Sequence, residues 1–269
     1  CAARDFLVNS IAKTNENAML DLYHSLEEKE QYRYDTGQVG RRSLKNTALA
    51  YLCHTGKEEY RRIALEQVKA AGNMTDEIGG LGALIHYECA ERDEALHHFY
   101  QKWNKESLVM NKWLSMQAIS HVSGGLQRVQ RLMRDPVFNI NNPNKLSSLL
   151  VSFAKFNTRN FHTPDGLAYR FFADLVLDVD TRNPSLASRL VSQFNQWKRF
   201  DPMRRELMKK ELERIVAKDI RETDVAGDDG KYRENDERDV HHARGFVRVY
   251  RAVTLMGEVI RNFHWHLGR

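Results

Sequence analysis

The sequence predicts an all-α fold, a superhelical array of paired antiparallel helices of the HEAT or armadillo α-solenoid type. The first observation is that each of the five prolines directly follows a residue that caps helices, as Asp135-Pro136, Asn142-Pro143, Thr163-Pro164, Asn183-Pro184 and Asp201-Pro202. Asp, Asn and Thr side chains accept hydrogen bonds from the free N–H groups of a first helical turn, and proline at the first helical position loses no bond there. We therefore expect most of these prolines to begin helices.

The second observation is the spacing of these helix starts, and the third is the lack of a strand pattern. From Asn142 onward the starts recur about every 20 residues, a helix plus a short loop, which is typical of stacked helical hairpins. No segment shows a convincing alternation of apolar and polar residues, the pattern of a half-buried strand.

Apolar residues already recur at helical spacing before the prolines begin, within residues 18–26 and 44–52. Glycines at positions 56 and 72 mark the ends of two such runs, and Asn73-Met74-Thr75-Asp76 is expected to supply a turn and a cap before the helix over 77–92. The next expected helices span residues 57–71, 77–92, 93–105, 107–120 and, after the Gly124-Gly125 loop, 126–132.

Beyond Phe138, helices are expected at about 143–156, 164–180, 184–199 and 202–218. We expect one helical-repeat domain over residues 1–218. Residues 219–245 are dense in charge and contain Gly227 and Gly230, which predicts a charged linker. Residues 246–269 carry an apolar stripe at helical spacing, which indicates either an amphipathic docking helix or a translated artefact.

Composition limits the possible partners. With 269 residues and 42% hydrophobic content, the chain is long enough for one large domain or two small ones. A mean hydropathy of −0.61 and the lack of an apolar run of about 18 residues argue against a membrane span. The 41 basic residues stand against 36 acidic ones spread along the chain, so we expect no nucleic-acid partner despite a net charge of +5.

Cysteine usage points to the compartment. Cys1, Cys53 and Cys89 form no CxxC pair and leave an odd count, which favours a reducing compartment over a disulfide scaffold. We expect the cytoplasm, with an organelle as the alternative. The chain begins with cysteine rather than methionine, and residues 1–5 resemble neither a signal peptide nor a start, so we expect a piece of a longer chain.

Several histidines and cysteines could suggest a metal site. Cys53-His54 lies on one expected helix, and His86 and Cys89 lie three residues apart on another, but a thiol and an imidazole on apolar helix faces are usually core residues. The Glu-x-x-His sequence at 94–97 has the spacing of helical di-metal proteins, which need two copies, and no second copy occurs. We therefore assign no metal ligand.

Seven segments carry a family resemblance: 40–52 (GRRSLKNTALAYL), 73–76 (NMTD), 108–113 (LVMNKW), 138–145, 160–169, 182–190 and 198–201. In residues, order and spacing they resemble the C-terminal helical domain of the M1 family of zinc aminopeptidases, in its bacterial-type branch. The resemblance covers roughly residues 16–218. It implies a superhelical stack of paired helices that closes over a catalytic domain and walls a large cavity.

The same resemblance implies that the parent enzyme removes N-terminal residues from peptide substrates. In that family the catalytic domain, the expected partner of this chain, holds one zinc ion through an H-E-x-x-H helix. None of the eleven histidines here is followed by glutamate, so that helix cannot be built. We therefore expect no cofactor and no catalytic residue in this chain, which alone should be inactive.

One site residue can be assigned by position. The resemblance implies that Arg189 lies in the wall of the substrate cavity, where its guanidinium could pair with a peptide carboxylate. A second cavity arginine of the bacterial-type branch falls at Ser147, which puts the two-arginine arrangement in doubt. The alternative is a structural Arg189 that holds a carboxylate or a helix C-terminus.

A competing hypothesis from another functional class is a non-enzymatic helical-repeat scaffold that binds proteins along its concave face. This hypothesis explains the helical array without requiring a catalytic domain elsewhere in the protein. The coding sequence upstream of Cys1 separates the two hypotheses, because only the peptidase requires an H-E-x-x-H helix there.

Overall fold

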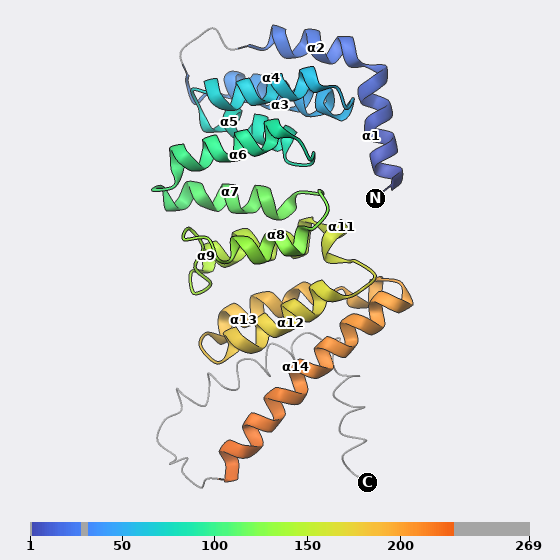
Figure 1. The fold of residues 1–269 in the computed structure, drawn as a ribbon, viewed down its shortest axis with the longest axis vertical. Helices are drawn as coiled ribbons and strands as arrows, with labels where there is room; N and C mark the ends of the chain where they lie inside the picture. Colours follow the sequence, from blue (N-terminus) through green and yellow to red (C-terminus); the bar gives the residue numbers. More distant parts are fainter. Residues whose placement is uncertain (1, 28–31, 229–269) are drawn as a thin grey trace. The chain divides into compact units, whose positions relative to one another are not determined.

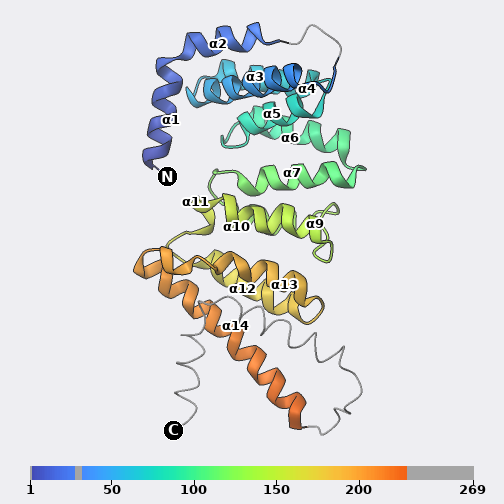
Figure 2. The same cartoon turned by 180° about the vertical axis from the view of Figure 1, so that it is seen from behind.

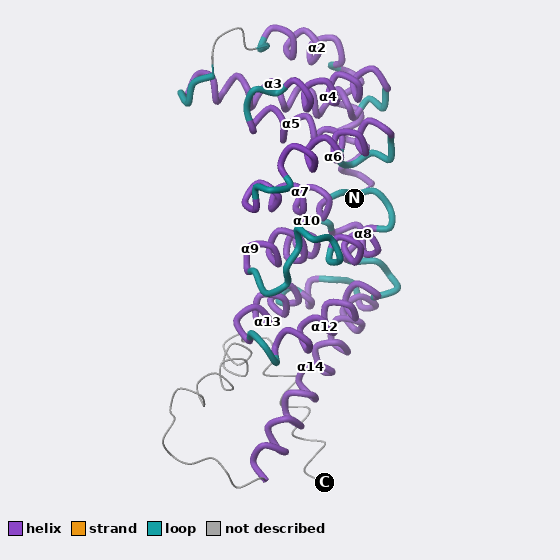
Figure 3. Tube along the Cα trace, turned by 60° about the vertical axis from the view of Figure 1, so that its left-hand side comes forward, coloured by secondary structure: helices purple, strands orange, loops and turns teal. Residues whose placement is uncertain are grey.

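The computed structural model describes residues 2–27 and 32–228, with side chains described as far as residue 218. All regular secondary structure within these ranges is helical (Figure 3), so the all-α prediction is confirmed. The chain divides into two units, Cys1–Phe138 and Asn139–Arg269, and the domain expected over 1–218 spans both. None of the described helices is long and apolar enough to cross a membrane.

The first unit is a succession of helices, and from α3 onward they are joined by short loops (Figure 1). Helix α2 packs on α3, α3 on α5, and α4 on both α5 and α6, while α7 contacts α6 and α8. Each helix is thus covered by those nearest to it in sequence, as in a helical-repeat array. Their bounds are α1 Ala2–Thr14, α2 Glu16–Ser25, α3 Thr36–His54, α4 Glu58–Ala70, α5 Met74–Leu84, α6 Ala90–Trp103, α7 Ser107–Ile119 and α8 Gly125–Leu132.

Local capping explains where several of these helices begin. The cap expected within Asn73-Met74-Thr75-Asp76 is supplied by Asn73, whose side-chain oxygen accepts a hydrogen bond from the Asp76 N–H at 2.9 Å. Asp35 caps α3 in the same way, with 3.1 Å to the Gln38 N–H. Gly124 precedes α8 with φ +72°, a left-handed conformation that glycine adopts without steric cost.

The helix predicted over 77–92 is wrong, because α5 ends at Leu84 and α6 begins only at Ala90. The intervening segment is held by the chain that follows α7. The Ser120 hydroxyl donates to the Ile85 carbonyl at 2.6 Å, and the His121 N–H donates to His86 Nδ1 at 3.2 Å. The first of these bonds satisfies a backbone carbonyl that a continuous helix would have bonded within itself.

The second unit combines α-helices with short 3₁₀ turns, which are wound more tightly, and a π-helix, which is wound more widely. Helix α12 packs on α13 and on the long α14, as Figure 2 shows from behind. The bounds are α9 Pro143–Leu146, the π-helix η1 Ser147–Val151, α10 Ser152–Phe156, α11 Thr158–Phe161, α12 Leu167–Asp180, α13 Pro184–Val191, the 3₁₀ turns η2 Ser192–Phe194 and η3 Trp197–Arg199, and α14 Pro202–Asp228.

Three of the five prolines begin helices, so the expectation for most of them is confirmed. They are the first residues of α9, α13 and α14. Pro136 lies instead in a turn closed by a bond from the Phe138 N–H to the Asp135 carbonyl. Pro164 also lies in a turn, and α12 begins three residues later, after Gly166 with φ +66°.

Three other helix predictions for this unit need correction. The helix expected over 143–156 contains the π-helix, and the helix expected over 184–199 gives way to 3₁₀ turns after Val191. Helix α14 passes the expected boundary at residue 218 and continues to Asp228, so the charge-rich segment begins as helix. The remainder of the expected linker over 219–245, and the expected helix over 246–269, lie outside the described residues.

An aromatic cluster forms the core of the second unit. Phe161 is fully buried, and its ring centroid lies 4.9 Å from that of Phe172 and 5.5 Å from that of Tyr169. Phe153 and Phe194 complete the cluster at 5.7 Å and 6.4 Å. Edge-to-face packing of this kind stabilises a core beyond the area it buries.

His162 makes the stability of this unit dependent on pH. Its Nδ1 lies 2.8 Å from the Tyr169 hydroxyl, and its ring packs on Phe200. Burial, with a smaller effect of Arg204, lowers the pKa of His162 from 6.5 to about 4. Between these two values the unfolded chain binds the additional proton, so the stability present above about pH 6.5 is lost as the pH falls toward about 4.

We therefore expect thermal unfolding to show a steeper loss of stability between about pH 7 and about pH 5 in the natural chain than in a His162→Gln variant. The substitution removes the titrating group and keeps a side chain that can hydrogen-bond to Tyr169. Circular dichroism melts at each pH measure the difference. An identical pH dependence in both chains would show that His162 is not the cause.

Candidate functional site

Arg189 lies in the last turn of α13, where capping and burial fix the orientation of the helix. The Asn183 side chain accepts a hydrogen bond from the Leu186 N–H at 3.2 Å at the start of this helix. Leu186 and Leu190 are buried, whereas Arg189 is exposed. The helix therefore presents the guanidinium away from the core.

The structure brings Arg189 close to Ser147, the position at which the resemblance places a second cavity arginine. Arg189 Nη1 donates a long hydrogen bond of 3.5 Å to the Ser147 hydroxyl, across 42 residues of sequence. No carboxylate of the described residues forms an ion pair with Arg189, so its charge is not neutralised by a neighbour there. A cation in the last turn of a helix is also favoured by the helix dipole.

Ser147 begins the π-helix of this unit. The Ser152 N–H reaches back five residues to the Ser147 carbonyl, and the Ser152 hydroxyl donates to the same oxygen at 3.3 Å. Single π turns of this kind occur frequently at functional sites. The Arg189–Ser147 pair is thus an exposed cation beside a hydroxyl, a combination that can bind a carboxylate.

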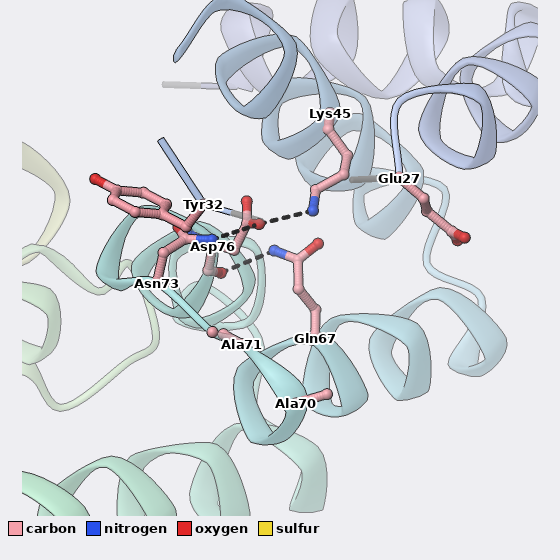
Figure 4. Close-up of a pocket in the computed structure, with 9 residues that line it drawn as sticks. Glu27, Tyr32, Lys45, Gln67, Ala70, Ala71, Asn73 and Asp76 are labelled. Atoms are coloured by element: carbon pink, nitrogen blue, oxygen red, sulfur yellow. Dashed lines mark hydrogen bonds and ion pairs between the residues drawn. The ribbon is translucent and has the colours of Figure 1, made fainter. Parts of the chain in front are cut away.

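A separate polar cavity of about 360 Å³ lies in the first unit (Figure 4). Side chains from α3, α4 and the start of α5 converge there, as the close-up shows. The cavity is lined by Glu27, Tyr32, Lys45, Gln67, Ala70, Ala71, Gly72, Asn73 and Asp76.

Asp76 is the centre of the hydrogen-bond network in this cavity. Its Oδ2 accepts bonds from Lys45 Nζ at 2.9 Å and from Asn73 Nδ2 at 3.1 Å. Its backbone carbonyl accepts a bond from Gln67 Nε2 at 2.8 Å (Figure 4). The side chains of Lys45 and Asp76 are each only 8% exposed. These groups bind one another and join three helices, so we assign the network a structural role.

The cysteines and histidines considered as metal ligands do not form a site. Cys53 is fully buried, and its sulfur contacts the Tyr60 carbonyl at 3.5 Å. Burial raises the pKa of the Cys53 thiol to about 12, which leaves it protonated and unreactive. His86 stacks on His121 with ring centroids 4.3 Å apart. Within the described residues, no three His, Cys, Asp or Glu side chains lie close enough to hold a metal ion.

A family model described as "Domain of unknown function (DUF3458_C) ARM repeats" matches residues 1–226. The match begins before and ends after the range of roughly 16–218 that carries the sequence resemblance. Its description as ARM repeats supports the armadillo-like solenoid predicted from the sequence.

Curated relatives named Aminopeptidase N also match. The chain is 38% identical to that of Caulobacter vibrioides, over 80% of this chain and 25% of the relative. It is 35% identical to that of Haemophilus influenzae and 32% identical to that of Escherichia coli, over 80% and 79% of this chain and 24% of each relative. The chain therefore spans about a quarter of the length of these relatives.

A solved structure matches over the same extent. The crystal structure of Legionella pneumophila aminopeptidase A in complex with aspartic acid aligns with a TM-score of 0.73 and 31% sequence identity. The alignment covers 80% of this chain and 26% of that protein. Both the sequences and this structure thus relate the chain to one part of a longer enzyme.

Proposed function

The chain belongs to the DUF3458_C family of ARM-repeat domains and is the C-terminal helical domain of an M1 aminopeptidase, and from this premise we propose the activity of the whole protein. The parent enzyme removes N-terminal amino acids from peptides with one zinc ion. The observation that carries this proposal is the 32–38% identity to three proteins named Aminopeptidase N over about 80% of the chain. The scaffold hypothesis is not favoured, because these relatives are peptidases.

The zinc ion belongs to the missing catalytic domain. The residues described here do not fit it, because they offer no cluster of three metal-binding side chains. In the parent enzyme, zinc would be held by residues of the catalytic domain and would supply Lewis-acid chemistry there. This chain caps the catalytic domain and controls which peptides enter.

Arg189 is the residue through which we propose that the domain contacts substrate. Its exposed guanidinium, with the Ser147 hydroxyl at 3.5 Å, can bind the carboxylate at the far end of a short peptide. The free thiols of Cys53 and Cys89 are compatible with a cytoplasmic location for the parent.

We expect Arg189→Ala in the parent enzyme to raise KM for short peptides about tenfold and to leave hydrolysis of a chromogenic amino-acid amide within about twofold of the natural rate. The lost charge-assisted hydrogen bond acts on the end of the peptide that the small substrate lacks. Steady-state kinetics with both substrates, and with a C-terminally amidated peptide, measure the effect.

The matched control is Arg182→Ala. Arg182 is an exposed arginine of the same unit whose partner is Asp178. It should leave the kinetics of every substrate unchanged. Equal losses on peptide and on chromogenic amide in Arg189→Ala would refute the substrate role and indicate a structural arginine.

A further inference from the structure

A second cavity of the first unit, of about 120 Å³, is rich in arginine. Arg92 comes from the first turn of α6, and Arg128 and Arg131 come from α8. Ser120 follows the end of α7 and faces the same space. The full lining is Ile85, Arg92, Asp93, Leu96, Gln117, Ser120, Arg128 and Arg131.

The three guanidinium groups have donor capacity that the described residues do not use. Arg92 donates from Nε and Nη2 to Asp93 Oδ1 at 2.9 Å and 2.6 Å. Arg128 donates from Nη2 to the carbonyls of Val122 and Ser123 at 3.3 Å and 3.1 Å. The Nη1 atoms of Arg92 and Arg128 are buried and have no hydrogen-bond acceptor among the described residues.

Arg131 adds a third cation, because its exposed side chain makes no hydrogen bond or ion pair within the described part of the chain. A buried donor without an acceptor destabilises the folded chain, and a charged donor does so more strongly. Such an arrangement is stable when an acceptor from outside the chain completes it.

The charges around the cavity do not cancel. Asp93 is the one carboxylate in the lining and stands against three arginines. Burial lowers the pKa of Arg128, the charges of Arg92 and Arg131 lower it further, and Glu88 and Asp93 oppose this shift. The positive charges therefore repel one another within a partly buried space.

We propose that Arg92, Arg128 and Arg131 form a binding site for a small oxyanion, a carboxylate or a phosphate group. Guanidinium groups bind both anions through paired N–H donors, and the Nη1 groups of Arg92 and Arg128 have no acceptor among the described residues. The cavity has the volume for one such group with part of its parent molecule. This site does not depend on the proposed peptidase function, since it lies in another unit from Arg189.

The proposal is tested by isothermal titration calorimetry of the 269-residue chain with inorganic phosphate at constant ionic strength. We expect saturable binding at one site. Arg131→Gln should weaken binding about threefold to tenfold, because it removes a cation that makes no hydrogen bond or ion pair within the described residues. Arg41→Gln, at an exposed arginine of α3 far from the cavity in sequence, should bind phosphate like the natural chain.

A second variant distinguishes a binding site from a structural cluster. Asp93→Asn removes the carboxylate that competes for Arg92, so phosphate should bind more tightly by about threefold or more. A purely structural cluster gives no reason for a gain of affinity. The source of the anion is identified with an N-acetylated dipeptide, since a preference for its free carboxylate over phosphate indicates a peptide ligand and the reverse preference indicates free phosphate.

Two outcomes would overturn the proposal. The first is the absence of saturable binding of both phosphate and the dipeptide to the natural chain and to Asp93→Asn. The second is binding that Arg131→Gln and Arg41→Gln weaken equally, because the effect would then follow net charge rather than the cavity.

Discussion

Replacing Asp76 with alanine is expected to lower the free energy of unfolding of the first unit by about 3–5 kcal/mol. The substitution leaves the Lys45 ammonium buried without its carboxylate, which lies 2.9 Å away in the natural chain. It also removes the acceptor for Asn46 Nδ2 at 3.1 Å and for Asn73 Nδ2. Urea unfolding followed by circular dichroism measures the loss.

The control for Asp76→Ala is Glu58→Ala, which breaks an ion pair with Arg62 on the exposed surface of α4. Exposed pairs contribute little, so this variant should lose less than about 1 kcal/mol. If Asp76→Ala were no more destabilised than Glu58→Ala, the network around the larger cavity would not hold α3, α4 and α5 together. The structural role assigned to this network would then be wrong.

Replacing Phe161 with alanine is expected to destabilise the second unit by about 3–5 kcal/mol. The ring is fully buried, with its centroid 4.9 Å from that of Phe172 and 5.7 Å from that of Phe153. Its removal leaves a cavity that the surrounding rings can fill only in part. Thermal and urea unfolding of the variant report the size of the effect.

Phe156→Ala makes the same chemical change five positions away and is the matched control. Phe156 is 57% exposed, so its loss should cost less than about 1 kcal/mol. Similar stabilities for Phe161→Ala and Phe156→Ala would mean that the aromatic cluster does not form the core of this unit.

The fold class followed from the sequence because capping is local chemistry. Asn142, Asn183 and Asp201 each accept a bond from a backbone N–H two or three residues ahead, and a helix begins there. The same dipeptide signal at Asp135-Pro136 leads only to a turn. A cap residue thus predicts a change of direction, and the chain that follows decides whether a helix forms.

The break between α5 and α6 could not be predicted from local sequence. The Ile85 carbonyl and the His86 ring are bonded by Ser120 and His121, which lie 35 residues further along the chain. Apolar periodicity continues across the break and therefore indicates one helix. Contacts between repeats cause such interruptions. These contacts can be identified only once the fold is known.

The two candidate sites also differ in how much of each could be predicted from the sequence. Arg189 was found by resemblance, but its contact with Ser147 across 42 residues depends on the packing of α13 against the π-helix. The arginine cavity gave no sequence signal, because Arg92 and Arg128 belong to different helices and stand among many other basic residues. The unused buried donors of these two arginines are visible only in the structure.

Determining the coding sequence upstream of Cys1 tests most directly whether this chain is the C-terminal domain of a metallo-aminopeptidase. We predict an H-E-x-x-H sequence on a helix in the same reading frame, with a further glutamate downstream as the third zinc ligand. An initiation codon directly before Cys1, with no such zinc motif in the protein, would contradict the assignment and favour a helical-repeat scaffold.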